Sequence, residues 1–479
     1  NPMINQNDLN NIFKGIQVRP AVQHKIKQTI VSPPTVQFQP EYGYYVNKRV
    51  SVIKDLEMPQ KIAVIGLIIT QSLFFIFTQQ YTNLTSAAIS LQSDESFRLQ
   101  IDNQIIYYSA GIIGGIVIIT LTPLVDSTLI SVFLMVVSLA VLMLKQFIRT
   151  EDFFWQSAVM GFCQNQFPLT NNFIINDYFP VSETNNVYLL ETLIRIFGAI
   201  IYNIEYMDTG ILQQGTQKGE SVFQSVFFSK WINFSLAIVA MLFFVAFQLQ
   251  IQTLIKVNMQ RLRELSPIKY KVSLVRHLFW VSYDNIQAEG IMLAIIFIGF
   301  RMLTVSVWSN MFIFFQECFF ISDFMPCTYA YWICCLVTCI VIVPVLNYVN
   351  QRPIIQFFCC LLLVLTYTTL SLMKSEQTLL IMISGVLGVL RGAANPLSKS
   401  LITPFVYGVA NLNRMENIIF ILNSVAMLVV SCILRIAVWA NASIRAFPYF
   451  HLGVSLLISV LSCSCMVLDF RKQGFVSNS

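Results

Sequence analysis

Long apolar stretches without charged residues constrain this chain more than any other feature. Nine stretches of at least 18 residues contain no Asp, Glu, Lys or Arg. A helix of about 20 apolar residues crosses the hydrocarbon core of a bilayer, so each stretch predicts a membrane span. The stretches are Ile62–Ser93, Asn103–Val125, Ser127–Leu144, Phe153–Asn176, Trp231–Ile255, Phe324–Gln351, Pro353–Met373, Asn417–Leu434 and Ala446–Leu468. Three further apolar segments contain charged residues, namely Val187–Ile204, Gly290–Gln316 and Gln377–Ser398, and they bring the prediction to twelve spans.

The composition agrees with a membrane protein and excludes several other classes. Hydrophobic residues make up 56% of the chain and charged residues only 11%, whereas soluble domains are about one quarter charged. The apolar runs are continuous rather than alternating, which predicts an all-α helical bundle instead of a β-barrel. So few charges do not form a nucleic-acid-binding surface. No catalytic motif is present, and the cysteines and histidines form no metal or disulfide pattern, so we expect neither an enzyme nor a cofactor.

The distribution of positive charge predicts the orientation of the chain. If the N-terminus is inside, 19 of the 30 Lys and Arg residues lie on the inner side, seven on the outer side and four within spans. Inner loops carry the excess of positive charge in membrane proteins. Both termini are therefore predicted on the cytosolic or matrix side, in a membrane that the sequence does not identify.

A basic loop divides the predicted spans into six and six. The predicted segments are a polar tail (1–60), a first half (61–255), the basic central loop (256–289), a second half (290–468) and a short tail (469–479). Similar sequences recur in corresponding spans: Thr122–Asp126 matches Val343–Asn347, and Phe167–Thr170 matches Asn395–Ser398. Matching segments in the same order indicate an internal duplication.

This plan resembles the major facilitator superfamily, whose members have twelve helices in two six-helix halves, both termini inside and a central cytosolic loop. The superfamily signature between helices two and three is a glycine, an acidic residue and a basic cluster. Gly115 and Asp126 match its first part, while Ser127–Ile130 replaces the basic cluster. In the second half, Asn347 stands where an acid is usual and Arg352 is the basic partner. The gating residues implied by the resemblance are Gly115, Asp126, Asn347 and Arg352.

Two short segments resemble one branch of that superfamily. Gly161–Pro168 followed by Asp177–Pro180 is similar to the choline and haem transporter branch, which has a glutamine and a proline in helix four. A cage for a quaternary ammonium group needs clustered Trp or Tyr. The first span offers Phe74, Phe75 and Phe77 but no Trp, so we do not expect choline as a substrate.

Two arginines lie deep within spans, where a charge is costly and usually faces a cavity or a partner. Arg301 and Arg391 fall near the middle of their spans. Helices one, four, seven and ten line the central pathway in the proteins that the chain resembles, which implies that both guanidinium groups face a substrate. Because a guanidinium group binds carboxylate or phosphate bidentately, we predict a site for a small organic anion. The alternative is that each arginine binds helix carbonyls and has a structural role.

Amide side chains in the first and fourth spans are candidates to orient the substrate, because they both donate and accept hydrogen bonds. Interhelical bonding is the alternative role for these amides. Two residues of the seventh span extend the predicted pocket, although an aromatic residue near a span boundary also serves as an interfacial anchor. The substrate-binding candidates besides the arginines are Gln71, Gln164, Gln166, Asn171, Trp308 and Asn310.

Glu191 and Arg195 lie four residues apart in the fifth span, on one face of a helix. This spacing predicts an internal ion pair. Glu191 is also the one carboxylate well inside a span, which makes it the candidate for proton coupling. We favour the structural ion pair over coupling.

Two functions from different classes remain. The first is a secondary active or facilitative transporter that works by alternating access in the lipid bilayer and moves a small organic solute, which we expect to be anionic. The second is a structural subunit of a large membrane assembly that has the transporter fold without transport. The polar tail 1–60 shows no apolar period and is the candidate segment for binding protein partners. We predict transport, because transport is the common function of the superfamily that the chain resembles.

Overall fold

The computed structural model describes most of the chain outside the polar tail. Within the described residues the chain is helical and contains no strand. The described ranges are 57–90, 96–147, 154–179, 181–208, 220–264, 288–309, 325–348, 352–373, 376–402, 409–439 and 446–477. The tail 1–56 and most of the central loop, 265–287, lie outside them.

Long apolar helices dominate the structure. In the described part of the chain, nine helices are long and apolar enough to cross a membrane. They are α4 (Met58–Ser90), α5 (Ser96–Leu121), α6 (Ser127–Phe147), α10 (Glu220–Gln250), α15 (Met325–Tyr348), α16 (Arg352–Leu372), α17 (Gln377–Ile402), α18 (Val409–Trp439) and α19 (Ala446–Ser477). The other helices are α7 (Phe154–Gln164), α8 (Phe167–Tyr178), α9 (Val181–Asp208), α11 (Gln252–Glu264) and α13 (Ala288–Ser309). The count of twelve spans stays a prediction.

The predicted fourth span is broken in the middle. Its apolar run forms two helices, α7 and α8, which are separated at Asn165 and Gln166. Pro168 lies in the first turn of α8. Because proline has no backbone N–H, it cannot continue the hydrogen-bond ladder of α7, whereas it is well tolerated at the start of a helix. The related Pro396 of α17 is accommodated inside a continuous helix.

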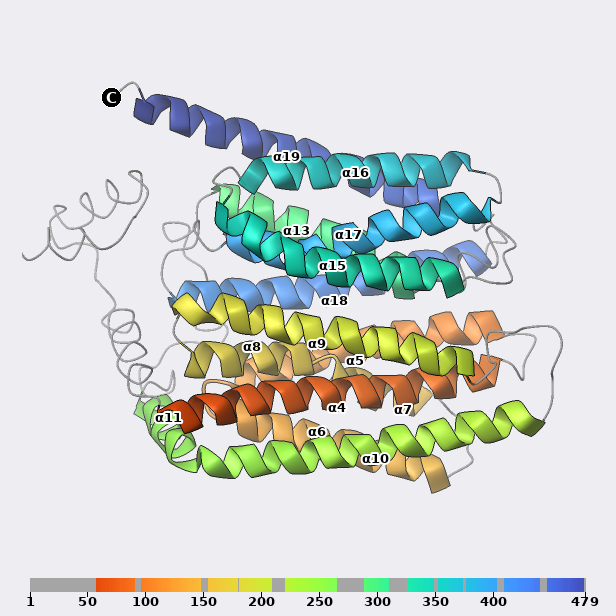
Figure 1. Ribbon diagram of the computed structural model, residues 1–479, viewed down its shortest axis with the longest axis vertical. Coiled ribbons are helices and arrows are strands. Elements are labelled where there is room, and N and C mark those ends of the chain that lie inside the picture. Colours follow the sequence, from red (N-terminus) through yellow and green to blue (C-terminus); the bar gives the residue numbers. More distant parts are fainter. Residues whose placement is uncertain are drawn as a thin grey trace, which may run out of the picture.

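The central loop begins as a helix that the charge pattern alone did not predict. The chain turns at Ile251 at the end of α10 and continues as α11, whose Lys256 and Arg263 are exposed while Asn258 and Leu262 are buried. This alternation of exposed and buried side chains is typical of an amphipathic helix. Figure 1 shows α11 at one end of the bundle, at an angle to α10.

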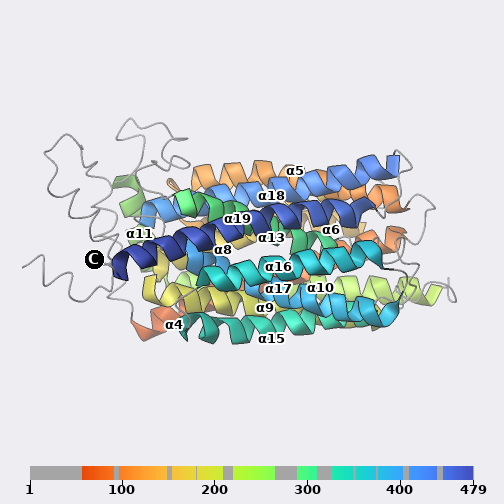
Figure 2. The same cartoon turned by 90° about the horizontal axis from the view of Figure 1, so that it is seen from above.

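The long helices lie side by side in one bundle, with their axes roughly aligned (Figures 1 and 2). Contacts between the helices before and after the central loop are made chiefly by two pairs: α5 packs against α18, and α9 packs against α15. Buried hydrophobic side chains form two clusters. One contains residues between Ala63 and Ile255. The other contains residues between Leu293 and Cys465, together with Ile101 and Ile196.

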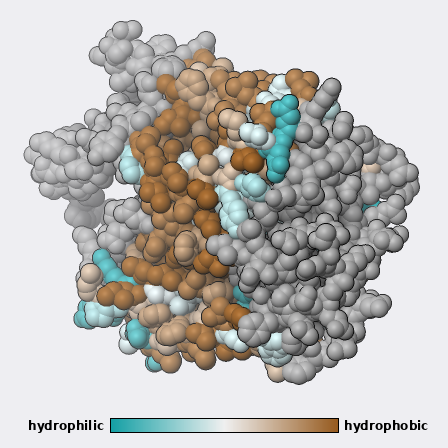
Figure 3. All heavy atoms as spheres, turned by 45° about the vertical axis from the view of Figure 1, so that its right-hand side comes forward, coloured by the Kyte–Doolittle hydropathy of each residue, from teal (hydrophilic) through white to brown (hydrophobic). Residues whose placement is uncertain are grey.

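Large apolar side chains also point outward from the bundle. Leu365, Met382 and Val460 are 63%, 65% and 64% exposed, respectively. Figure 3 shows hydrophobic residues over much of the described part of one face. A soluble protein rarely exposes apolar surface on this scale, so this surface is suited to contact with lipid. The outward-facing apolar side chains and the long apolar helices are those of an integral, multi-pass membrane protein.

Candidate functional site

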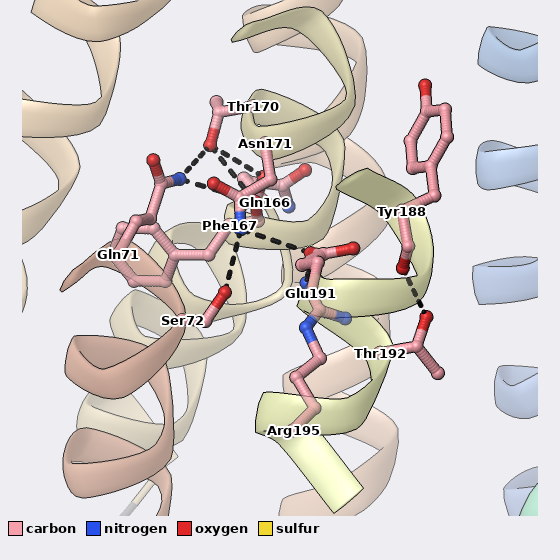
Figure 4. Close-up of polar contacts among 10 residues, drawn as sticks. All are labelled: Gln71, Ser72, Gln166, Phe167, Thr170, Asn171, Tyr188, Glu191, Thr192 and Arg195. Carbon is pink, nitrogen blue, oxygen red and sulfur yellow. Dashed lines mark hydrogen bonds and ion pairs between the residues drawn. The ribbon is translucent and has the colours of Figure 1, made fainter. Parts of the chain in front are cut away.

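Buried amide side chains join the broken helix to α4. The Nε2 atom of Gln71 donates to Thr170 Oγ1 over 2.5 Å and to the Phe167 carbonyl oxygen over 3.3 Å (Figure 4). Both acceptors lie in the first turn of α8, directly after the break. The predicted substrate residue Gln71 is therefore fully buried against α8. It fixes the start of that helix relative to α4.

The helix break is also tied to α5. Gln166 donates from Nε2 to the Gly111 carbonyl oxygen over 2.8 Å. The two helices approach closely enough for this bond because Gly161 faces α5, where an added Cβ would collide with the Tyr107 carbonyl group. A β-carbon on Gly114 of α5 would likewise lie 2.8 Å from Gln166 Nε2. Glycine on both helices thus brings Gln166 to its partner.

Asn171 and Glu191 form a second buried connection, between α8, α4 and α9. Asn171 Nδ2 donates to Ser72 Oγ over 3.2 Å and to Glu191 Oε1 over 3.0 Å (Figure 4). Arg195 Nη2 donates to the same Glu191 oxygen over 2.5 Å, which makes the i,i+4 ion pair predicted from the spacing. The guanidinium group of Arg195 also lies 5.2 Å from the centre of the Phe75 ring. Glu191 is buried and Arg195 only partly exposed.

Each of these three amides has an oxygen atom that is not hydrogen-bonded among the described residues. Gln71 Oε1, Gln166 Oε1 and Asn171 Oδ1 are all buried and lack a donor there. Buried amide oxygens are costly to leave unpaired. The amide oxygens on α4, at the helix break and on α8 can therefore accept hydrogen bonds from a hydroxyl group or a water molecule.

Two further arginines interact electrostatically with the Glu191–Arg195 pair. The charges of Arg301 on α13 and Arg391 on α17 act on each other and on Arg195, and Glu191 acts on both Arg195 and Arg301. The Nη1 atom of Arg391 is buried without a hydrogen-bond partner among the described residues. We call Arg195, Arg301, Arg391 and Glu191 the arginine cluster. The sequence identified its members separately, but not the association of Arg195 with the other two arginines.

Close packing of α17 on α15 positions Arg391. An added β-carbon on Gly388 would overlap the Tyr331 carbonyl group, and one on Gly392 would overlap the Cys335 carbonyl group. Both glycines flank Arg391, and the charge of Arg391 reaches Tyr331 and Cys335 on α15. The absence of side chains at these two glycines lets the backbones approach, as is common in membrane bundles.

Of the remaining substrate candidates, the structure describes the side chain of Gln164 alone. Gln164 is buried at the end of α7 and has an interaction of its own. Trp308 belongs to α13, but its side chain lies outside the described part of the structure, and Asn310 lies outside it entirely. The gating candidates Asn347 and Arg352 lie on α15 and α16, but their side chains are also outside the described part of the structure.

The gating candidate Asp126 is fully buried and bonded to neutral groups. Its carboxylate accepts hydrogen bonds from Thr128 N and Oγ1 over 2.9 and 2.6 Å, from Tyr178 OH over 2.7 Å, and from Asn258 Nδ2 over 2.7 Å. Thr128 lies in the first turn of α6, so Asp126 caps that helix. Tyr178 ends α8 and Asn258 lies on α11. Asp126 therefore joins three helices at one end of the bundle without a basic partner in the described residues.

Gly115 lies where α5 packs against α18. A β-carbon at this position would come within 2.9 Å of Ile421 Cδ1 and 3.1 Å of Phe420 Cε1, both on α18. Substitution would push the two helices apart. Gly115 thus permits close packing across one of the two contact lines between the segments before and after the central loop.

Polar side chains along the length of α18 connect it to helices that precede the central loop. Near one end, Arg435 Nε lies 2.6 Å from Asp102 Oδ1 on α5. Near the other end, Asn176 Nδ2 on α8 donates to Glu416 Oε2 over 3.3 Å. At 1.5 Å per residue the two connections are separated by about 28 Å, close to the thickness of the hydrocarbon core. No spacing in the sequence indicates the Asp102–Arg435 contact, because the two residues are remote in the chain.

Comparison with known proteins relates the fold to transporters. Significant structural similarity is found for 217 chains of solved structures. One is the crystal structure of the human organic anion transporter MFSD10 (TETRAN), with a TM-score of 0.59 and 9% sequence identity. The similarity covers 85% of this chain and 100% of that chain. No protein-family model matches the chain, and no curated protein matches it significantly.

At 9% identity the similarity establishes the fold alone. The chain has a helical fold similar to that of this transporter structure, and membership of the major facilitator superfamily stays a prediction. The similarity to the choline and haem branch stays a prediction.

Proposed function

We propose that this protein is a transporter of small organic anions that works by alternating access. The observation that carries the proposal is the arginine cluster, in which three interacting cations are accompanied by one carboxylate, which acts on two of them, inside an apolar bundle. Charges in such surroundings are expensive unless they meet a partner, and they usually mark a substrate or ion pathway. An anionic substrate is the partner that this cluster lacks.

The proposed architecture has two halves of six spans. The first half contains α4, α5, α6, the broken α7–α8, α9 and α10, and the second contains α13, α15, α16, α17, α18 and α19. The two halves would move against each other along the α5–α18 and α9–α15 contacts. Arg195 belongs to the first half, while Arg301 and Arg391 belong to the second. A substrate bound among them would lie between the moving parts, which alternating access requires.

The residues of the site divide into binding and orienting groups. Arg301 and Arg391 bind the anion, since neither has a hydrogen-bonded carboxylate among the described residues. Arg195 is shared between the anion and Glu191. The unpaired amide oxygens of Gln71, Gln166 and Asn171 accept hydrogen bonds from hydroxyl groups of the substrate. The amide nitrogens meanwhile hold α4, α5, α8 and α9 together.

Two connections along α18 are proposed as gates. The Asp102–Arg435 pair between α5 and α18 would close one end of the contact between the halves, and the Asn176–Glu416 hydrogen bond between α8 and α18 would close the other. Each end is held by a part-buried polar contact that would break when that end opens. Asp126 and Gly115 would maintain the packing that these movements depend on.

The similarity to the human organic anion transporter MFSD10 (TETRAN) supports transport of this substrate class. The alternative function, a structural subunit without transport, is not favoured by this comparison. The tail 1–56, on which that alternative depends, lies outside the described residues.

The proposal is tested with the purified protein in liposomes. Uptake is measured for a mixture of labelled organic anions, with uncharged and cationic compounds of similar size as the comparison. We expect anion uptake, reduced at least tenfold in Arg301→Gln and in Arg391→Gln, because one charge-assisted hydrogen bond contributes about 1.5–3 kcal/mol. Arg263→Gln, which removes an exposed arginine on α11, is the matched control and should leave uptake unchanged.

Two results would contradict the proposal. One is a folded, monodisperse protein that moves none of the anions. The other is anion uptake that is unaffected in both arginine variants, which would retain transport but remove the arginine cluster from the site.

A further inference from the structure

The charges of the arginine cluster do not balance. Arg195, Arg301 and Arg391 contribute three positive charges and Glu191 contributes one negative charge, which leaves +2. Glu191 is the one carboxylate among the described residues that acts on both Arg195 and Arg301. The imbalance lies within a bundle whose surroundings are apolar. A net charge of +2 there is costly until a ligand neutralises it.

Unused hydrogen-bond donors accompany the unbalanced charge. Arg391 Nη1 and Arg195 Nε are both buried without a hydrogen-bond partner among the described residues. Arg195 gives Nη2 to Glu191, and its Nε is left without an acceptor in the described part of the chain. The two donors lie on α17 and α9, which are different helices. A ligand that satisfies both must present negatively charged oxygens to each.

From this balance we propose that the substrate of the site is a small organic dianion, namely a dicarboxylate or a phosphate monoester. This inference rests on the proposed function and specifies its substrate class. A dianion neutralises the cluster completely. A monoanion leaves one arginine uncompensated, whereas a trianion introduces an excess negative charge beside Glu191. The net charge of the site therefore selects the charge of the substrate.

Glu191 sets this selection without contacting the substrate itself. It is held by Arg195 Nη2 and by Asn171 Nδ2 on the same oxygen, so it neutralises one arginine permanently. Glu191→Gln preserves a hydrogen-bond acceptor for both donors but raises the net charge to +3. Arg391→Gln has the opposite effect and lowers the net charge to +1. The two substitutions change the preferred substrate charge in opposite directions, which a purely structural role would not do.

The experiment measures ligand binding as the shift in thermal unfolding of the purified protein, with uptake into liposomes measured in parallel. The carboxylate series is butyrate, succinate and tricarballylate, which carry one, two and three carboxylates on chains of similar length. Glycerol 3-phosphate, with glycerol as its uncharged control, tests the phosphate monoester. Which of succinate and glycerol 3-phosphate binds more tightly identifies the source of the two charges.

For the unsubstituted protein we expect a dianion to bind at least tenfold more tightly than butyrate or tricarballylate, the equivalent of one charge-assisted hydrogen bond. The preference should move to tricarballylate in Glu191→Gln and to butyrate in Arg391→Gln. Arg263→Gln is the control for a lost surface charge and should leave the preference unchanged.

The outcomes separate this inference from the function on which it rests. Equal binding of butyrate and succinate, or a preference that does not move in the two variants, would overturn the dianion inference and leave anion transport intact. The dianion inference would also be overturned if the protein took up other organic anions but bound none of the carboxylates and no glycerol 3-phosphate. A folded protein that neither binds nor moves any anion would overturn both.

Discussion

The Nε atom of Arg435 lies 2.6 Å from Oδ1 of Asp102, although 333 positions separate the two residues in the chain. Their side chains are 32% and 33% exposed. The pair connects α18 to α5 near one end of the bundle. In the proposed mechanism it must break whenever that end opens.

Removing this connection should favour opening more than it lowers stability. Because the pair is partly exposed, we expect it to contribute only about 0.2–1 kcal/mol to the free energy of unfolding. Asp102→Asn and Arg435→Gln should each make the central pathway more accessible to water-soluble probes applied from that end. The double variant should differ little from either single variant in a double-mutant cycle. Independent, additive effects of the two substitutions would show that the pair does not act as one gate.

Asp126 should be among the most sensitive polar positions in the described residues. Asp126→Asn replaces an acceptor oxygen with an N–H donor that faces either Thr128 or the Tyr178 and Asn258 donors. We expect a loss of about 2–3 kcal/mol in the free energy of unfolding, since a buried network is left with two donors in conflict. Tyr178→Phe removes one donor only and should cost about 1 kcal/mol. Chemical denaturation of the two variants in the same detergent measures the difference, and equal stability would contradict the network.

The close approach of α7 to α5 predicts a sharp contrast between two glycines. Gly161→Ala should destabilise the protein by about 2 kcal/mol or more, because the new β-carbon would overlap the Tyr107 carbonyl group and overpacking is costly. Gly453 of α19 is the matched control, since an added β-carbon there meets no atom within 4 Å. Gly453→Ala should stabilise the helix by up to about 1 kcal/mol. Thermal unfolding of the two variants tests the contrast, and a tolerated Gly161→Ala would mean that the helices lie farther apart.

Removing one partner of the Glu191–Arg195 pair should lower the free energy of unfolding more than removing both partners. Arg195→Gln leaves a buried carboxylate with Asn171 as its remaining donor, and we expect a loss of about 3–5 kcal/mol. Arg195→Gln combined with Glu191→Gln removes both charges and should recover most of that loss, because neutral amides can still hydrogen-bond. The free energies of unfolding of the unsubstituted protein and the two variants test this prediction. A double variant as unstable as Arg195→Gln would rule out the ion pair as the cause.

Several features of the site were predictable because they depend on neighbours in the chain. The Glu191–Arg195 pair follows from a four-residue spacing on one helix, and the structure confirms it. The depth of Arg301 and Arg391 follows from counting residues along apolar segments. Gln71, Gln166 and Asn171 were identified as polar residues in apolar spans, but only the structure shows that their amide nitrogens bond neighbouring helices.

Other features could not be predicted, since they depend on how the helices rotate and pack. Nothing near Arg195 in the sequence indicates that its charge meets those of Arg301 and Arg391. The contact between Arg435 and Asp102 joins residues 333 positions apart, which no local pattern indicates. The amphipathic helix α11 looked like part of a basic loop, although its Asn258 is bonded to Asp126.

The sequence by itself determined that the described chain is a bundle of membrane helices, because hydrophobic length and charge are local properties that act on each segment alone. It also predicted which charged residues lie in the middle of apolar segments. Only the tertiary structure decided that the fourth span breaks at Asn165 and Gln166, and which side chains gather around that break. The reason is physical: within a bilayer every helix is independently stable, whereas the choice of neighbour depends on glycine contacts and single hydrogen bonds between residues far apart in the chain.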